Sequence, residues 1–292
     1  ASKPKKAMCV TIFTVVMNIL LDVVFIRWWH WGIKGAALAT IISQTLALCW
    51  QITLFANKNE LLHLKRGIYK LKANLVKNII SIGISPFLMN ACACVIVIFI
   101  NNQLVRFGGD MSVGAYGIGN SIAMIFVMSV IGLNQGMQPI AGYNYGAQQY
   151  ERMMRVVKLS IITATCIMLT GWSLAMFVPY HCVRLFTTNP ELIKRSINAL
   201  HIIMMMFPLI GCQMVITNFF QCIGKVKISI FLSLSRQLLF LLPLLILLPN
   251  FYGINGVWAS MPTSDFIAVV VAIITMTVYL RRFKKDMQSK NS

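Results

Sequence analysis

Residues 132–155 read GLNQGMQPIAGYNYGAQQYERMMR and connect two long hydrophobic runs. Glycine allows tight turns and close backbone approach, and proline cannot continue the hydrogen-bond ladder of a helix. The stretch therefore predicts a junction between two helices, with the ladder broken at the proline. The residues that distinguish this junction from the surrounding apolar sequence are Gln135, Gly136, Gln138, Pro139, Gly142, Tyr143 and Gly146.

The composition around this junction is that of a membrane protein. Hydrophobic residues make up 58% of the 292 residues and charged residues 11%, against about 45–50% and about 25% in a soluble domain. A net charge of +19 is compatible with nucleic-acid binding, but that function needs the basic residues on one face of a soluble fold. Here they fall between membrane-length runs, so we predict contact with lipids and no nucleic-acid partner.

Runs of about 20 apolar residues predict helices that cross the membrane. We expect an all-α polytopic membrane protein with eight transmembrane helices and no β-strands. Most lysine and arginine residues lie on the side that holds both termini, which the positive-inside rule makes cytoplasmic. The predicted spans lie near residues 8–29, 33–56, 78–104, 112–137, 159–179, 198–223, 228–248 and 254–280.

An internal repeat indicates how the spans are grouped. Residues 31–44, WGIKGAALATIISQ, match residues 252–265, YGINGVWASMPTSD, in Gly-Ile-x-Gly and the small residues that follow. Such a repeat is typical of transporters built from duplicated units. We predict a complete six-helix lobe over 78–292, the last two helices of a first lobe over 1–56, and a basic cytoplasmic linker over 57–77. The linker is either a solvated connection or an interfacial amphipathic helix, and the whole suggests a twelve-helix transporter without its first four helices.

The ordered string Q-G-x-Q-P-x-x-G-Y-N-x-G-A-x-x-x-x-R, which starts at Gln135, resembles the helix 8 to helix 9 junction of the multidrug and toxic compound extrusion (MATE) transporters. The resemblance covers essentially the whole chain. It implies two lobes around a central cavity in the cell inner membrane, and a monomer without a cofactor. It also implies efflux of amphipathic or cationic small-molecule drugs by antiport with H⁺ or Na⁺.

Asp22 is the first candidate for the coupling site. An acid within a span is costly and is normally retained for a partner or a pathway. Asn18 lies one helical turn before it, and Thr40 reaches about the same depth on the next span. The MATE resemblance implies the same three residues as part of a proton or cation site, although the family's acid on helix 1 and polar partner on helix 4 have no counterpart. The alternative is a carboxylate that is retained only for local structure.

Arg236 and Asp265 lie at similar depths on consecutive spans. An unpaired charge at that depth would be costly, so the sequence predicts an ion pair that fixes the packing of the last two helices beside the cavity. Direct participation of this pair in ion coupling is the alternative.

The other residue patterns exclude several classes of function. The eight cysteines and four histidines have no metal-ligand spacing, and there is no cluster of carboxylates for metal-diphosphate chemistry. We therefore predict no metal, no catalytic residues and no enzyme activity. Two alternatives to drug export remain, a lipid-linked oligosaccharide flippase of the same superfamily and a truncated chain that transports nothing.

Overall fold

The computed structural model describes residues 4–56 and 73–291, and this part of the chain contains helices and the turns between them, with no β-strand. It divides into two compact units, residues 1–77 and 78–292. Seven of its helices are long and apolar enough to cross a membrane, and a bent helix pair raises the number of spans to eight. The prediction of an all-α polytopic membrane protein is therefore confirmed.

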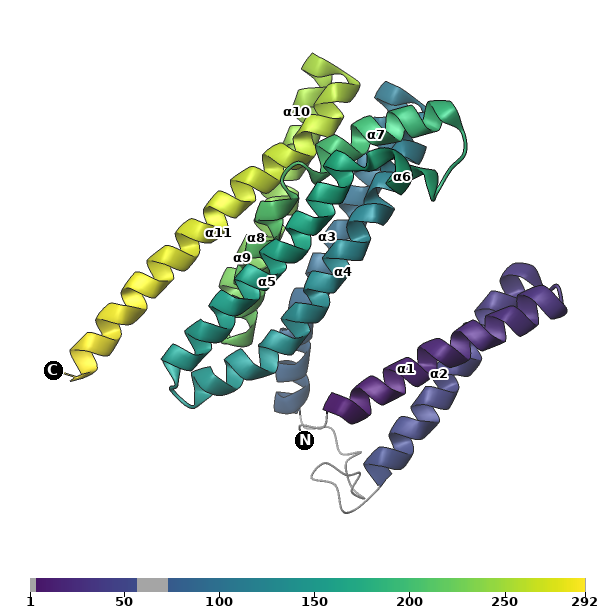
Figure 1. The fold of residues 1–292 in the computed structure, drawn as a ribbon. Coiled ribbons are helices and arrows are strands. Elements are labelled where there is room, and N and C mark those ends of the chain that lie inside the picture. The colour runs from purple at the N-terminus through teal and green to yellow at the C-terminus, as the bar shows by residue number, and fades with distance from the viewer. Residues whose placement is uncertain (1–3, 57–72, 292) are drawn as a thin grey trace. The chain divides into compact units, whose positions relative to one another are not determined.

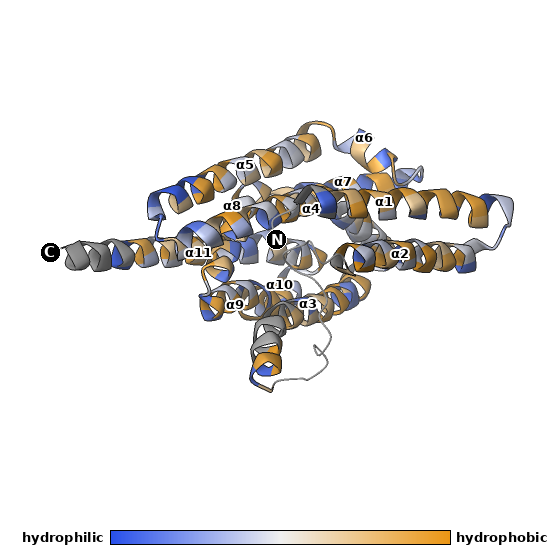
Figure 2. Cartoon of the chain, turned by 90° about the horizontal axis from the view of Figure 1, so that it is seen from below, coloured by the Kyte–Doolittle hydropathy of each residue, from blue (hydrophilic) through white to orange (hydrophobic). Residues whose placement is uncertain are grey.

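The first unit is a helical hairpin. Helix α1 (Pro4–Asp22) continues into a π-helical segment, η1 (Val23–Trp28), and α2 (Gly32–Ala56) returns beside it. Large apolar side chains face outward along both helices, including Ile12, Ile19 and Ile41. In Figure 2 most of the ribbon of α1 and α2 has the orange colour of hydrophobic residues. In a bilayer, lipid chains would surround these side chains, so their exposure carries no penalty.

The second unit is a bundle of long and short helices (Figure 1). Its central helices α4, α5 and α8 contact one another along their lengths, α7 contacts α4, and α11 contacts α8 and α10. The bounds are α3 (Ala73–Gly108), α4 (Asp110–Gly146), α5 (Tyr150–Phe177), α6 (Pro179–Arg184), α7 (Pro190–Met204), α8 (Phe207–Cys222), α9 (Val226–Leu234), η2 (Ser235–Leu241), α10 (Leu242–Tyr252) and α11 (Ile254–Asn291).

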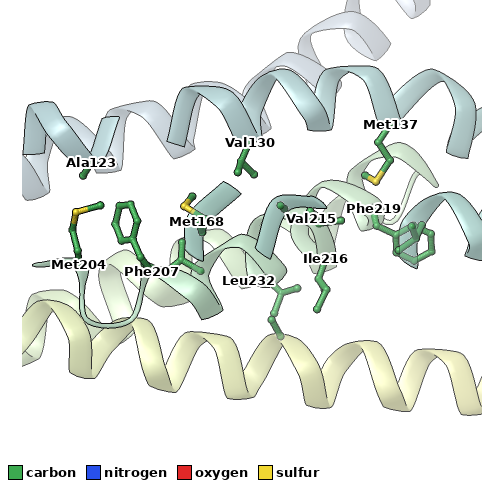
Figure 3. Close-up of a cluster of buried hydrophobic side chains, with 14 of the residues drawn as sticks. Ala123, Val130, Met137, Met168, Met204, Phe207, Val215, Ile216, Phe219 and Leu232 are labelled. Carbon is green, nitrogen blue, oxygen red and sulfur yellow. The ribbon is translucent and has the colours of Figure 1, made fainter. Parts of the chain in front are cut away.

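The main hydrophobic core lies between these central helices (Figure 3). Val130 and Met137 of α4 point toward Met168 of α5 and toward α8. Phe219 of α8 is fully buried in the same cluster. Because close packing and interhelical contacts, rather than exclusion from water, hold helices together in a membrane, this interdigitation is what joins α4, α5 and α8.

The repeated Gly-x-x-Gly has the same structural role in both units. Gly32 and Gly253 each lie at the turn between two antiparallel helices and have positive φ angles, 54° and 57°, which glycine adopts without strain. Gly35 and Gly256 lie one helical turn later. A Cβ atom on Gly35 would lie 3.1 Å from the carbonyl oxygen of Phe25, and one on Gly256 would overlap the carbonyl oxygen of Leu248. The second glycine of each repeat therefore allows the two helices of its hairpin to approach closely.

The predicted break at Pro139 is wrong, because α4 continues through this residue to Gly146. Proline removes one helical hydrogen bond, whereas the segment around it buries Met137 and Ala141 in the core. The packing of this segment outweighs the lost bond. The chain turns only at residues 147–149, where Gln148 has a positive φ of 58°.

The predicted span 198–223 also differs from the structure. Helix α7 starts earlier, at Pro190, and its axis makes an angle of 47° with that of α8. Pro208 lies in the first turn of α8, where its missing N–H and fixed φ suit the start of a helix. The bend after Met204 therefore has a local cause.

Asn189 provides the N-cap of α7. Its Oδ1 accepts hydrogen bonds from the backbone N–H groups of Glu191 (3.0 Å) and Leu192 (3.4 Å). Replacing Asn189 by alanine should lower the free energy of unfolding by about 1 kcal/mol, because two N–H groups lose their acceptor. Reversible unfolding in mixed detergent micelles would measure the loss. Asn189→Asp keeps an acceptor and is the matched control, and equal destabilisation by both substitutions would exclude capping as the cause.

Candidate functional site

The first polar site lies in the hairpin of the first unit. The Nδ2 group of Asn18 on α1 donates to Oγ1 of Thr40 on α2 at 3.4 Å. The Thr40 hydroxyl itself donates to the carbonyl of Ala36 at 3.0 Å, which leaves its oxygen free to accept from Asn18. The structure thus brings together two of the three residues that the sequence placed here.

Asp22 lies on the same side of α1, one helical turn after Asn18. Its Oδ1 is buried and has no hydrogen-bond partner among the described residues. A buried polar oxygen without a partner is uncommon and needs an explanation, such as an ion or a proton that binds there. This carboxylate oxygen is therefore an acceptor that no described residue uses.

The backbone changes conformation at Asp22, which is the last residue of α1 before η1. Single π-helical turns inside α-helices occur frequently at functional sites. The π-helical segment is not predictable from the sequence, because no local residue pattern in Val23–Trp28 distinguishes it from an ordinary α-helix.

The second polar site lies within the second unit. The Nε of Arg236, in η2, is 3.5 Å from Oδ1 of Asp265 on α11. Their side chains are 33% and 14% exposed, so the pair is partly buried and opens on one side. The contact joins the last two spans, as the similar depth of the two residues in the sequence predicts.

The pair lines a cavity of about 280 Å³ between α3, α4, α7, α8, η2 and α11. Most of the wall is aliphatic or thioether, with three methionines. The remaining polar groups in the wall come from Tyr116, Asn120, Gln237 and Ser264. Tyr116, Asn120 and Gln237 are not among the residues predicted from the sequence, where the one available signal is that Gln237 adjoins the intramembrane Arg236.

The junction residues 135–146 do not line this cavity. All of them lie in α4, which ends at Gly146. Tyr143 is 75% exposed, and a Cβ on Gly142 would lie 3.5 Å from the carbonyl oxygen of Cys222. The described part of the chain also contains no group of three or more His, Cys, Asp or Glu residues able to hold a metal ion.

Comparison with known proteins places the chain in a family. The family model described as MatE matches residues 81–247. The multidrug export protein MepA of Staphylococcus haemolyticus is 25% identical over 98% of this chain and 63% of its own length. MepA of Staphylococcus aureus strain NCTC 8325 is 25% identical over 96% of this chain and 61% of its own length. The chain therefore spans somewhat more than three fifths of these relatives.

Solved structures agree with this assignment. The MATE multidrug transporter DinF-BH is 36% identical to this chain, with a TM-score of 0.81 over 91% of this chain and 60% of its own. An outward-facing multidrug resistance MATE family transporter of the MOP superfamily superposes with a TM-score of 0.85 at 22% identity, over 96% of this chain and 63% of its own. By its matched domain and its fold, the chain belongs to the MatE family of membrane transporters.

Proposed function

We propose that this protein takes part in multidrug efflux across the cell inner membrane, driven by antiport of H⁺ or Na⁺. The observation that carries the proposal is the buried Oδ1 of Asp22, which has no hydrogen-bond partner within residues 4–56 and 73–291, beside the Asn18–Thr40 hydrogen bond. A carboxylate at this position binds the coupling cation, and the amide and hydroxyl hold the two helices of the hairpin in register. The MepA relatives, which are named as multidrug export proteins, support drugs as the cargo.

The proposal also includes the membrane topology of the chain and the grouping of its helices into lobes. Residues 1–56 supply the last two helices of a first lobe, 57–77 the linker and 78–292 the second lobe. Both termini face the cytoplasm, because most basic residues of the chain lie on that side. The linker prediction falls mainly on residues outside the described part of the chain.

The test is export of ethidium, an amphipathic cation, by bacterial cells that lack their own drug exporters and express this chain. Asp22→Asn removes the charge with little change in shape, so the efflux rate should fall at least about tenfold while the amount of protein in the membrane stays constant. Asp110→Asn is the matched control, since Asp110 lies in the exposed first turn of α4. It should leave efflux unchanged.

Two results would contradict the proposal. Undiminished efflux by Asp22→Asn would remove Asp22 from the coupling step. Equal ethidium accumulation in cells with the unmodified chain and in cells with an empty vector would favour a chain that transports nothing.

The structure gives no support to the flippase alternative. Binding a diphosphate requires several cationic groups that converge on its oxygens. The cavity of the second unit contains one described arginine, Arg236, and its charge is balanced by Asp265.

A further inference from the structure

We propose that the cavity of the second unit binds a compact, uncharged amphipathic molecule whose hydroxyl group hydrogen-bonds to Gln237 and Arg236. The inference rests on the proposed export function only in treating such a molecule as a further cargo, separate from cations such as ethidium, which this cavity does not bind. Binding itself involves residues of the second unit alone.

The wall of the cavity determines the shape and polarity of the ligand. Its volume of about 280 Å³ lies just below the range of about 300–1,000 Å³ that holds drug-sized ligands, so the ligand is compact. Met124, Met214 and Met261 line it together with aliphatic residues. Flexible thioethers adapt to varied apolar shapes. The greater part of the ligand is therefore apolar.

Gln237 determines the first polar requirement. Its Oε1 is buried and has no hydrogen-bond partner among the described residues, although the residue lines the cavity. Leaving a buried acceptor unpaired costs free energy that a hydrogen-bond donor on a ligand would recover. The ligand therefore carries a donor.

Arg236 determines the second requirement. It adjoins Gln237 in η2, lines the same cavity, and has five N–H donors, more than one carboxylate can accept. A hydroxyl group is one donor and two acceptors, so it can donate to Gln237 while it accepts from Arg236. An ether or a quaternary ammonium group cannot do both.

The ion pair excludes permanent charge. Arg236 and Asp265 neutralise each other at 3.5 Å, so the cavity offers no net charge to balance a cation or an anion. Transfer of an unbalanced charge from water into an apolar cavity is costly. An uncharged hydroxyl compound avoids this cost.

The experiment measures binding to the purified 292-residue chain in lipid nanodiscs by scintillation proximity, with binding to empty nanodiscs subtracted. The radiolabelled probes are thymol, its methyl ether and phenyltrimethylammonium. Thymol should bind at least about tenfold more tightly than its ether, since the two differ by one buried hydrogen bond. Phenyltrimethylammonium should show no specific binding.

Two variants locate the binding site. Gln237→Leu should weaken thymol binding about tenfold and leave the ether unchanged, because only thymol uses the amide oxygen. Gln103→Leu is the matched control: Gln103 Oε1 is also buried and has no partner in the described part of the chain, but Gln103 does not line the cavity. It should bind thymol as the unmodified chain does.

Equal affinity for thymol and its ether, binding of phenyltrimethylammonium as tight as that of thymol, or unchanged thymol binding by Gln237→Leu would each overturn the proposal. If Gln237→Leu fails to fold, the comparison of the three probes on the unmodified chain still decides the question. Failure here would leave the effect of Asp22→Asn on ethidium efflux untouched, so the two proposals can fail independently.

Discussion

Arg236→Asp is expected to lower the free energy of unfolding by about 3 kcal/mol, since removing one partner of a buried ion pair typically costs about 3–5 kcal/mol. The substitution leaves the Asp265 carboxylate without its cation and places a second negative charge close to it on the neighbouring span. The opening toward the cavity places the effect at the lower end of the range. Asp265→Arg should be destabilising for the same reason, with two positive charges in contact.

The double variant Arg236→Asp with Asp265→Arg restores opposite charges and should recover most of the loss. Thermal unfolding in detergent, followed by fluorescence-detected size exclusion, would compare the four proteins. Arg195→Asp is the control, because Arg195 and Glu191 form an exposed pair at 2.9 Å on one helix. Breaking such a pair costs about 0.2–1 kcal/mol. A double variant no more stable than the single variants would show that the ion pair does not hold η2 and α11 together.

Gly256→Ala should destabilise the last helical hairpin by about 2–3 kcal/mol, within the range of about 1–3 kcal/mol that is typical of overpacking. The added Cβ would overlap the carbonyl group of Leu248, which belongs to the backbone of α10 and cannot rotate away. Relief requires α10 and α11 to move apart, which disturbs the cluster of buried hydrophobic residues to which Leu245 of α10 and Val257 and Trp258 of α11 belong.

Alanine substitutions at two other glycines provide the comparison for the destabilisation by Gly256→Ala. Gly35→Ala in the first hairpin meets Phe25 at 3.0–3.1 Å, so a shift of a few tenths of an ångström relieves it and the loss should be smaller. Gly136→Ala meets nothing within 4 Å inside α4 and should stabilise the helix by up to about 1 kcal/mol. Thermal unfolding in detergent, measured as for the Arg236–Asp265 variants, would test the expected order of stability of the three glycine variants. Equal stability of Gly256→Ala and Gly136→Ala would show that close approach at Gly256 is not required.

The sequence was sufficient for features that depend on composition and on simple geometry. Long apolar runs dictate membrane helices, because backbone groups in lipid must be satisfied within the helix. The contact between Arg236 and Asp265 could be predicted from the helical rise per residue. When the ends of two antiparallel helices are known, the rise gives the depth of each residue in the membrane. The proximity of Asn18 and Thr40 was predicted in the same way, from their similar depths on two antiparallel helices.

Helix ends were less predictable. Gly136, Pro139 and Gly146 together favour a break in any local reading of the chain, yet α4 continues to Gly146. The reason is that packing against α5, α7 and α8 acts over the whole helix, whereas a proline removes only one hydrogen bond. The same limit applies to the start of α7 at Pro190, which the hydropathy of the chain did not mark.

The sequence by itself determined that this chain is a helical membrane protein with a repeated Gly-x-x-Gly hairpin and with charges at two depths inside the membrane. These features follow from residue type and spacing alone. Only the tertiary structure revealed the π-helical segments, the oxygens of Asp22 and Gln237 that have no partner among the residues it describes, and the cavity that joins Tyr116, Asn120 and Gln237. The physical reason is that whether a polar atom is satisfied, and whether a space is filled, depends on side chains from helices distant in the sequence.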